Sequence, residues 1–428
     1  MADLSQLEIE NKRLKIAMGE LEALIDIATA ISSSMSVEEI CDRIVGKVIK
    51  RCRASQGAIF LLGESENAPM ETFVRRKDSG VREHPARMGM ALTGWMIKHQ
   101  RALILSRDKD PDGLMKHSTE GVTSALTVPL KTQGKLIGVM TVFNRQDSVS
   151  FNMDDQRFLS IVAAQSAQSL EAARLQQEEK QLNQLKEEMR VAGQIQGTMM
   201  PHEFPSMSEY DIYATNLPAD EIGGDCYDVI QINSHRTLIS VGDVAGHGVG
   251  AALLMANAQA VVRSQLPFSE NADPDLREIV RGVSEFLSQW TEHDKYITLF
   301  LGILDSNDGT IEYVNAGHNP PMLLDSSGEL TELEAGGIPL GMFTGSFYDV
   351  GKITLEKHSR LLVFTDGVTE LANEADEQFG EERLGSFVKN SQSLDSKSFC
   401  EKLMTELKTY RGKAVQADDI TLLAIRRL

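Results

Sequence analysis

The sequence predicts a two-domain α+β protein in which a helical linker joins a small mixed domain to a larger two-sheet sandwich. Three observations support this prediction. The chain of 428 residues is longer than one ordinary core accommodates. Residues 171–192 have helical heptad spacing and contain no Gly or Pro. Short apolar, strand-like segments separated by Gly and polar turns occur on both sides of that stretch.

Composition excludes several classes of function. The formal net charge of −19 argues against nucleic acid and against anionic membrane surfaces as partners, since both require basic patches. No stretch approaches the roughly 20 apolar residues that span a bilayer, so we expect no membrane insertion. The four cysteines form no CxxC pair, which argues against a disulfide framework and a thiolate zinc site. A reducing, cytoplasmic location is therefore expected.

Residues 1–26 are predicted to form a coiled-coil helix. Leu7, Leu14 and Leu21 recur every seven residues, and Asn11 lies among the interleaved core positions. A polar Asn at such a position often fixes register and oligomeric state, so this pattern favours a dimer. The alternative is a single amphipathic helix packed on its own domain.

Residues 27–170 mix helices and strands in the manner of a compact α+β domain. The segment SVEEICDRIVGKVIKRC has helical spacing, and Ser36 with Glu39 matches a capping box. GAIFLLGE, RALILS and ALTVPLKTQGKLIGVMTVFNR are predicted strands, and an alanine-rich helix follows them.

This segment resembles a GAF domain, a small sensory fold of signalling proteins. Five residues weakly match a motif of cyclic-nucleotide-binding GAF domains: Asn144, Arg145, Phe151, Asp154 and Asp155. We interpret them as a turn and a helix N-cap, with cyclic-nucleotide binding as the alternative. Cys41 and Cys52 lie in a predicted helix and are expected to pack in the core rather than to bind haem or bilin.

Residues 171–200 are predicted to be a helical coiled-coil linker. Leu175, Leu182 and Met189 are spaced by seven, with Leu185 and Ala192 between them. Together with the N-terminal heptads, this pattern favours a parallel homodimer. The alternative is a solvated spacer helix.

Residues 201–428 contain four acidic positions beside apolar, strand-like segments: Asp225, Asp243, Asp366 and Asp418. The first three are expected at the end of a strand or in the turn just beyond it. Asp418 is expected at the start of the final strand. One Asp-Gly alone, such as Asp366 with Gly367, would be an ordinary turn. Four sites flanking core strands indicate a shared site instead, because a rigid sheet directs its strand ends to one place.

Carboxylates brought together repel one another unless a cation lies between them. Oxygen ligands without His or Cys favour Mg²⁺ or Mn²⁺, so the sequence predicts two such ions. The glycines after Asp243 would let the backbone carbonyl of Val244 reach the same metal. Two metals could lower the pKa of a shared water and so generate a hydroxide nucleophile.

The segments GGDCYD, GDVAGHG, NAGHNPP, FTDGVTE and ADDITLL resemble, in this order, the SpoIIE/RsbU-type branch of the PP2C-like serine/threonine phosphatases. The resemblance implies a PP2C-like sandwich of two central sheets flanked by helices. It implies that Asp243 bridges two metals, that the Val244 carbonyl completes one, and that Asp366 and Asp418 hold the other. Asp225 would bind metal directly or through water.

The resemblance leaves other residues with smaller roles. It makes Asp228 a weaker candidate beside the metal ligands, and Asp419 is expected to order the turn. His247 and His318 are expected to hydrogen-bond loop backbones near the site, with proton donation as the alternative. The sequence lacks the phosphate-binding Arg of animal PP2C enzymes near its first motif, so an unrecognised Lys or Arg would have to supply that charge.

A GAF domain, coiled linker and such a phosphatase imply a regulated enzyme that dephosphorylates serine or threonine on a protein, typically a STAS-type anti-sigma-factor antagonist. Two alternatives remain open at this point. One is a catalytically silent scaffold, which would be expected to have lost an acidic ligand. The other is a signalling module gated by a cyclic nucleotide.

Overall fold

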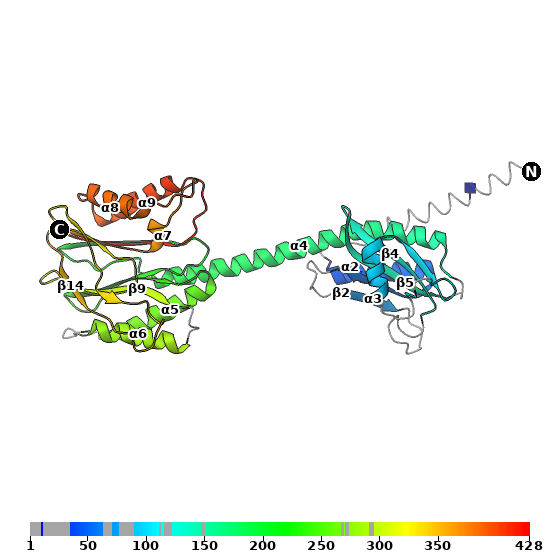
Figure 1. Cartoon of the computed structure of the whole chain (residues 1–428), viewed down its shortest axis with the longest axis horizontal. Helices are drawn as coiled ribbons and strands as arrows, with labels where there is room; N and C mark the ends of the chain where they lie inside the picture. Colours follow the sequence, from blue (N-terminus) through cyan, green and yellow to red (C-terminus); the bar gives the residue numbers. More distant parts are fainter. Residues whose placement is uncertain are drawn as a thin grey trace, which may run out of the picture. The chain divides into compact units, whose positions relative to one another are not determined.

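The computed structural model describes residues 10–11, 35–62, 71–76, 90–110, 113–114, 122–146, 150–266, 269, 274–290 and 295–428. The chain divides into two compact units, Met1–Asn183 and Gln184–Leu428, which are described separately here (Figure 1). The predicted coiled coil at 1–26 lies outside the described residues, apart from the two helical residues Glu10 and Asn11. No helix among the described residues is long and apolar enough to cross a membrane.

The first unit is built on an antiparallel sheet with the strand order β2-β1-β5-β4-β3. Its strands are β1 (Ala54–Leu61), β2 (Glu71–Arg76), β3 (Leu103–Ser106), β4 (Ser124–Thr132) and β5 (Lys135–Arg145). Its helices are α2 (Val37–Cys52), α3 (Met90–His99) and the first part of α4 (Met153–Met199). The predicted strands of this domain are thus observed, and β2 is an additional one.

Side chains that alternate along β1 separate two cores. Ile59 belongs to the core that α2 and α4 cover, whereas its neighbours Ala58 and Phe60 belong to the core beside α3. Strand residues point alternately to the two faces, so one strand contributes to both cores. Ser36 and Glu39 form the predicted capping box at the start of α2, which confirms the helix start that the sequence indicated.

Two of the residues that match the cyclic-nucleotide motif pair with each other, and a third holds a neighbouring strand end. Arg145 forms an ion pair with Asp155, and the Asn144 carboxamide accepts the backbone N–H of Thr123 at 2.7 Å. Asn152 caps α4 by accepting the N–H groups of the first turn. These contacts support the interpretation as a turn and a helix N-cap.

None of the four cysteines of the chain forms a disulfide, and all four are buried.

Helix α4 continues without a break from the last helix of the first unit through the predicted linker. Its first part is buried against the sheet of that unit, as at Leu159 and Leu170. Further along, Leu175, Leu182 and Leu185 are each more than half exposed. Apolar side chains at heptad spacing on an exposed helix indicate a face that a partner helix could cover.

The second unit consists of two antiparallel sheets that pack face to face. One has the order β13-β10-β9-β8-β7 with β14 paired to β10, and the other has the order β12-β11-β15-β16-β6. The only parallel pair within the described part of these sheets is the short contact of β13 with β10. The first contains β7 (Cys226–Gln231), β8 (Arg236–Val244), β9 (Ile297–Asp305), β10 (Thr310–Ala316), β13 (Gly336–Gly337) and β14 (Gly351–Thr354). The second contains β6 (Tyr210–Leu217), β11 (Met322–Leu324), β12 (Leu330–Glu332), β15 (Arg360–Phe364) and β16 (Ile420–Arg427).

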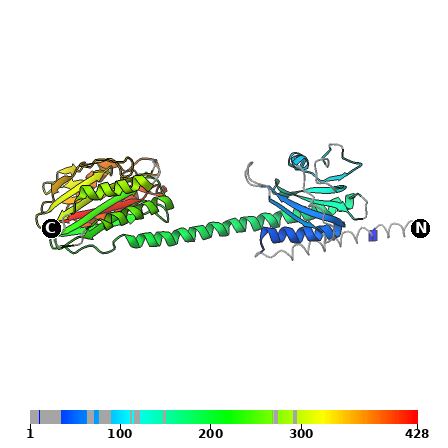
Figure 2. The same cartoon turned by 90° about the horizontal axis from the view of Figure 1, so that it is seen from below.

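Helices cover both outer faces, so this unit has four layers (Figures 1 and 2). Helices α5 (Val249–Ser264) and α6 (Leu276–Trp290) pack on the first sheet, while α8 (Gly380–Asn390) and α9 (Ser396–Arg411) pack on the second. A short helix, α7 (Asp366–Thr369), follows β15. The flanked two-sheet sandwich is as predicted, but α8 and α9 had not been picked out from the sequence.

The core between the sheets contains large side chains of both. Phe300 of β9 is fully buried and stacks on Tyr313 of β10 with 5.7 Å between ring centroids. Val363 and Leu423 contribute from the opposite sheet. This central layer fixes the two sheets relative to each other and therefore the relative positions of their strand ends.

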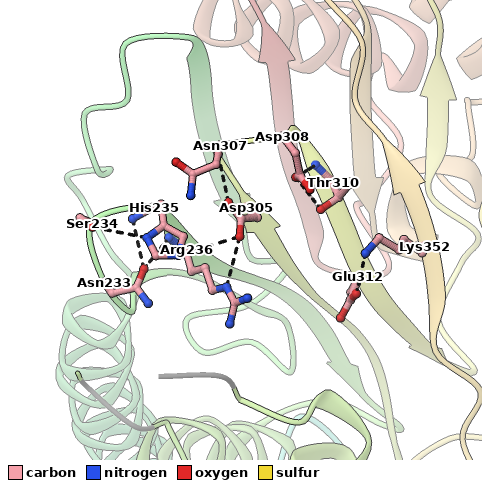
Figure 3. Close-up of polar contacts among 10 residues, drawn as sticks. All are labelled: Asn233, Ser234, His235, Arg236, Asp305, Asn307, Asp308, Thr310, Glu312 and Lys352. Atoms are coloured by element: carbon pink, nitrogen blue, oxygen red, sulfur yellow. Dashed lines mark hydrogen bonds and ion pairs between the residues drawn. The ribbon is translucent and has the colours of Figure 1, made fainter. Parts of the chain in front are cut away.

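Polar contacts hold the end of β8 that lies away from the predicted acidic site (Figure 3). Arg236 at the start of β8 pairs with Asp305 at the end of β9, with Nε 3.3 Å from the carboxylate. Asn233 accepts the backbone N–H of Arg236 at 2.8 Å. Lys352 and Glu312 pair across β14 and β10 at 2.9 Å. These contacts order the turns at this end of the sheet. The predicted acidic site lies at the opposite end of β8.

The packing of Phe300 gives a test of the fold. We expect Phe300→Ala to destabilise the second unit by about 3–5 kcal/mol, because a cavity remains between the sheets. Phe347, which is 70% exposed, provides a matched control, and Phe347→Ala should change stability by less than about 1 kcal/mol. Hydrogen exchange of peptides from β8 to β10 measures the local opening free energy. Equal protection in the two variants would contradict the packing.

Candidate active site

The four aspartates predicted to share a site come from neighbouring strands of both sheets. Asp243 is the penultimate residue of β8, and Asp366 follows β15 after one residue. Asp418 precedes β16 by two residues, in agreement with the prediction. Asp225 lies directly before β7, so its predicted place at or just beyond a strand end is wrong.

Antiparallel pairing explains why this difference does not separate the acids. Cys226 at the start of β7 pairs with Gly242 near the end of β8. In the other sheet, Leu422 near the start of β16 pairs with Phe364 at the end of β15. The start of one strand therefore lies beside the end of its neighbour. Two strand ends and two strand starts meet at the same edge of the sandwich.

Asp225 is the most buried of the four, with 2% of its surface exposed. Its Oδ2 accepts hydrogen bonds from Thr365 Oγ1 at 2.8 Å and Thr421 Oγ1 at 2.6 Å. Burial, followed by the nearby Asp243 carboxylate, raises the pKa of Asp225 well above its usual value, and the two hydroxyls oppose this shift. The two hydroxyls thus fix the direction of the carboxylate. Among the described groups that shift its pKa, none carries a positive charge.

Asp243 occupies the central position electrostatically. Its carboxylate is largely buried, and burial together with Asp366 and Asp418 raises its pKa to about 7, with the side-chain hydrogen bond to Asp225 opposing the shift. Its charge therefore interacts with those of the other three acids. A carboxylate in this environment gains most from a nearby cation, which would favour its ionised form.

The glycine-rich segment after Asp243 leads the chain from β8 into α5. Gly246 and Gly248 have φ values of +98° and +82°, which L side chains rarely adopt. The turn brings Gly224 close to this segment, since a Cβ added at Gly224 would lie 3.4 Å from the carbonyl oxygens of both Val244 and Gly246. The Val244 carbonyl, the predicted metal ligand, is thus next to the loop that carries Asp225.

Asp366 and Asp418 form the other half of the acidic cluster. Burial, then Asp418 and Glu370, raise the pKa of Asp366. Asp366 Oδ1 is buried and has no hydrogen-bond partner. Partial burial raises the pKa of Asp418, and His247 lies close enough to oppose that shift. The buried Oδ1 of Asp366 is a polar atom that requires a partner, and the described residues do not provide one.

These observations fit a divalent cation bound by oxygen. The donors are carboxylates with raised pKa values and an orphaned carboxylate oxygen, which suit hard ions such as Mg²⁺ and Mn²⁺. Within the described part of the chain, no three His, Cys, Asp or Glu side chains are gathered to hold one ion by themselves. Backbone carbonyls and water would therefore have to complete the coordination, as these ions commonly require.

Asp228 is engaged elsewhere. It is 2% exposed, and its Oδ2 lies 2.6 Å from Arg263 Nε and 3.2 Å from Gln259 Nε2, both on α5. This ion pair joins β7 to α5 behind the site. The Asp228 carboxylate is paired with a guanidinium, so Asp228 is not a member of the cluster of four acids.

Asp419 organises the loop before Asp225. Its Oδ1 accepts the N–H of Ala219 at 2.7 Å, and its Oδ2 accepts the N–H of Gly224 at 2.7 Å and that of Asp225 at 3.3 Å. Asp419 thus holds the loop that passes from β6 of its own sheet to β7 of the other. The sequence had suggested an ordering role for Asp419 in its own turn, and the contact with the 219–225 loop was not foreseen.

The two histidines differ in environment. His318 is 4% exposed, its Nδ1 lies 2.9 Å from Thr298 Oγ1, and burial lowers its pKa to about 4. A neutral imidazole at pH 7 supports the predicted structural role. Its ring contacts the Thr298 hydroxyl and also interacts with the backbone of Phe364, which opposes the fall in pKa. His247 is exposed on the glycine-rich segment.

Sequence reasoning missed several residues at the site. The hydroxyls of Thr365 and Thr421 each lie beside a predicted acidic motif, in FTDG and DDIT, and that adjacency was the available signal. Lys295 was also missed; its Nζ lies 3.4 Å from where a Cβ on Gly246 would be. No local pattern marks Lys295, because it reaches the glycine-rich segment only through the pairing of β8 with β9.

The raised pKa of Asp243 gives a pH-dependent prediction for the metal-free protein. Because ionisation is disfavoured in the folded state, the wild type should lose stability as pH rises from about 4 to about 7. Asp243→Asn removes that loss, so we expect it to be more stable than the wild type by about 1–4 kcal/mol at pH 8 and similar to it at pH 4. Urea unfolding in a chelator measures this, with the exposed Asp349→Asn as control. A stability difference that is the same at both pH values would contradict the assignment.

Comparison with known proteins agrees with this architecture. Residues 233–428 match the family profile described as Stage II sporulation protein E (SpoIIE), and residues 34–171 match that of the GAF domain. Asp225 lies outside the first match. Protein IcfG of Synechocystis is 28% identical over 56% of this chain and 41% of its own length. Phosphoserine phosphatase RsbU of Bacillus subtilis is 26% identical over 57% of this chain and 71% of its own.

A solved structure shows the same fold for the second unit. The SiaA PP2C domain of Pseudomonas aeruginosa superposes with a TM-score of 0.50 at 21% identity, over 57% of this chain and 98% of that one. The chain spans less than half of the length of IcfG. The matched profiles show that residues 34–171 are similar to GAF domains and residues 233–428 to SpoIIE domains, and the superposition shows that the second unit has the PP2C fold.

Proposed function

We propose that the protein is a metal-dependent phosphoprotein phosphatase that acts on phosphoserine or phosphothreonine and is regulated by its GAF domain. The observation that carries this proposal is the cluster of four aspartates at one edge of the two sheets, with pKa values raised by burial and mutual repulsion. The similarity to a phosphoserine phosphatase supports the reaction class. All four acids are retained, which disfavours the silent scaffold.

Asp243 would bridge two Mg²⁺ or Mn²⁺ ions, with the Val244 carbonyl completing one and Asp366 and Asp418 holding the other. Asp225 would bind directly or through water. Such ions, when bound, lower the pKa of water and neutralise charge on phosphate oxygens. The orphaned Oδ1 of Asp366 supports its role as a ligand.

The protein's own residues would prepare this site before the ions bind. Thr365 and Thr421 hold the Asp225 carboxylate in a fixed direction, so little ordering is required on binding. The carboxylates repel a phosphate in the absence of cations, so phosphate entry depends on metal occupancy. Lys295, beside the glycine-rich segment, is the candidate for the phosphate-binding cation that the sequence did not reveal.

The substrate is proposed to be a protein rather than a metabolite, and a STAS-type anti-sigma-factor antagonist is the specific candidate. The edge with the acids is open enough for Asp418 and His247 to be exposed, so a side chain on another protein could reach it. A cytoplasmic location accords with such a partner and stays a prediction.

Regulation is proposed to act through a parallel homodimer. The exposed leucines of α4, Leu175, Leu182 and Leu185, provide the apolar seam for a second copy of the helix. A signal in the GAF domain would change the pairing of α4 and thereby the metal site. The internal ion pair of Arg145 with Asp155 does not favour the cyclic-nucleotide alternative.

The catalytic proposal predicts hydrolysis of para-nitrophenyl phosphate and of a phosphoserine peptide that requires Mn²⁺ or Mg²⁺. Asp243→Ala should lower kcat by at least about 100-fold, since loss of even an outer-shell partner costs about 10- to 100-fold. Asp349→Ala removes an exposed carboxylate and should leave the rate unchanged. Metal-independent activity, or an Asp243→Ala variant as active as the control, would contradict the proposal.

The dimer proposal predicts that Leu182→Glu shifts the protein from dimer to monomer and changes its phosphatase rate, because a charge enters the apolar seam. Gln177→Glu adds the same charge at an exposed position outside the seam and should do neither. Light scattering gives the mass, and the assay above gives the rate. If Leu182→Glu behaves like Gln177→Glu in both measurements, the seam is not the regulatory interface.

A further inference from the structure

The end of α4 contacts the loop that leads to Asp225. The carboxamide of Gln196 makes two hydrogen bonds to one residue of that loop: its Nε2 donates to the carbonyl oxygen of Gly223 at 2.7 Å, and its Oε1 accepts the Gly223 N–H at 3.1 Å. The backbone N–H and C=O groups of Gly223 are therefore both held by one side chain. Such a two-point contact sets orientation as well as position.

One helical turn earlier, the backbones of α4 and the loop are in close contact. A Cβ added at Gly193 would lie 1.9 Å from the carbonyl oxygen of Glu221. Only glycine permits this approach. By contrast, a Cβ at Gly197 would meet nothing within 4 Å. The close contact is thus confined to the turn of α4 at Gly193 and does not extend to the next turn at Gly197.

Hydrogen bonds hold the loop beside a cavity on the side of α4. A cavity of about 400 Å³ lies between the end of α4 and β6, and Gln196, Gly223 and Asp225 are among the residues that line it. A loop beside a cavity has space to shift. Its position therefore depends on polar contacts. Gln196 supplies the two to Gly223, and Asp419 supplies those to Ala219, Gly224 and Asp225.

The same loop reaches the predicted metal ligands. Gly224 follows Gly223 and lies against the carbonyl oxygens of Val244 and Gly246. Asp225 comes next in the chain. A shift of Gly223 would move the backbone that carries Asp225 and would alter the space in front of the Val244 carbonyl.

A second contact fixes the end of α4 itself. The carbonyl oxygen of Met199 accepts hydrogen bonds from Arg263 Nη2 at 3.0 Å and Gln259 Nε2 at 3.3 Å. Arg263 is the residue that pairs with Asp228 on β7. The last turn of α4 is thus tied to the sheet, which keeps Gln196 at a defined height above the loop.

We propose that Gln196 is a positioning residue for metal binding: it sets the Gly223–Asp225 backbone and through it the ligands of the site. This inference rests on the proposed function and adds the residue through which α4 acts. A rotation or axial shift of α4 moves the Gln196 carboxamide away from Gly223. The loop then loses two hydrogen bonds, and the affinity for metal falls while the fold persists.

The test is Mn²⁺ binding to the full-length protein, measured by isothermal titration calorimetry on chelator-treated samples. Gln196→Met keeps the length of the side chain and removes both hydrogen bonds, and Gln194→Met is its control on an exposed position of the same helix. Gly193→Ala introduces the clash with Glu221, and Gly197→Ala is its control. Circular dichroism without metal reports whether each variant is folded.

We expect Gln196→Met and Gly193→Ala to bind Mn²⁺ about 10- to 100-fold more weakly than their controls, in the range found for residues that orient metal ligands. At saturating Mn²⁺, kcat should return close to that of the wild type, which a general loss of structure would not allow. Should Gln196→Met not fold, Gln196→Asn, which keeps the carboxamide but is too short to reach, must show the same weakening.

Unchanged Mn²⁺ affinity in both folded variants would overturn the positioning role and leave the proposed phosphatase activity intact. A wild-type protein that neither binds Mn²⁺ nor hydrolyses para-nitrophenyl phosphate would overturn the proposed function, and the positioning role with it.

Discussion

Electrostatic repulsion among the clustered carboxylates is the constraint on which the second unit depends. Burial and the surrounding acids raise the pKa of Asp243 to about 7, and nearly complete burial raises the pKa of Asp225 well above its usual value. A fold that brings these groups together loses stability at neutral pH unless a cation joins them. The strong packing between the sheets, for example around Phe300, compensates for this loss. The site is therefore destabilising in itself, which is common where structure has been arranged for chemistry.

The same constraint explains the polar contacts around the acids. Thr365 and Thr421 donate hydroxyl hydrogen bonds to Asp225, and Asp419 collects N–H groups of the loop before it. These contacts fix the direction of groups that would otherwise turn away from one another toward water. None of them provides a positive charge, so each one prepares the site for a cation without replacing it. The buried Oδ1 of Asp366, which has no hydrogen-bond partner among the described residues, likewise needs a cation or another partner.

Most of the fold was predictable because it depends on local patterns. The apolar segments that form β9, β10 and β15 have the lengths and flanking turns of strands, and the capping box at Ser36 marks the start of α2. The acids were identified because each stands beside such a segment. What could not be predicted depends on contacts between distant parts of the chain. Antiparallel pairing alone decides that Asp225, at the start of β7, meets acids at the ends of other strands. Amphipathic helices without a distinctive motif, α8 and α9, were passed over for a related reason: their role appears only when they cover the second sheet.

Helix α4 combines a feature that its sequence reveals with one that only the folded structure reveals. Its heptad leucines were readable from spacing, because a repeat of seven is a local property of the sequence. Its last two turns were not, since Gln196 and Gly193 have meaning only against Gly223 and Glu221 of a loop that follows later in the chain. Both kinds of residue lie on the same rigid element. Under the proposed regulation, a change at the leucine seam would reach Gln196 along the helix and would disturb a contact that depends on hydrogen-bond direction. In the proposed mechanism, the metal site responds to α4 because direction-dependent hydrogen bonds from Gln196 and Asp419 hold its loop beside a cavity.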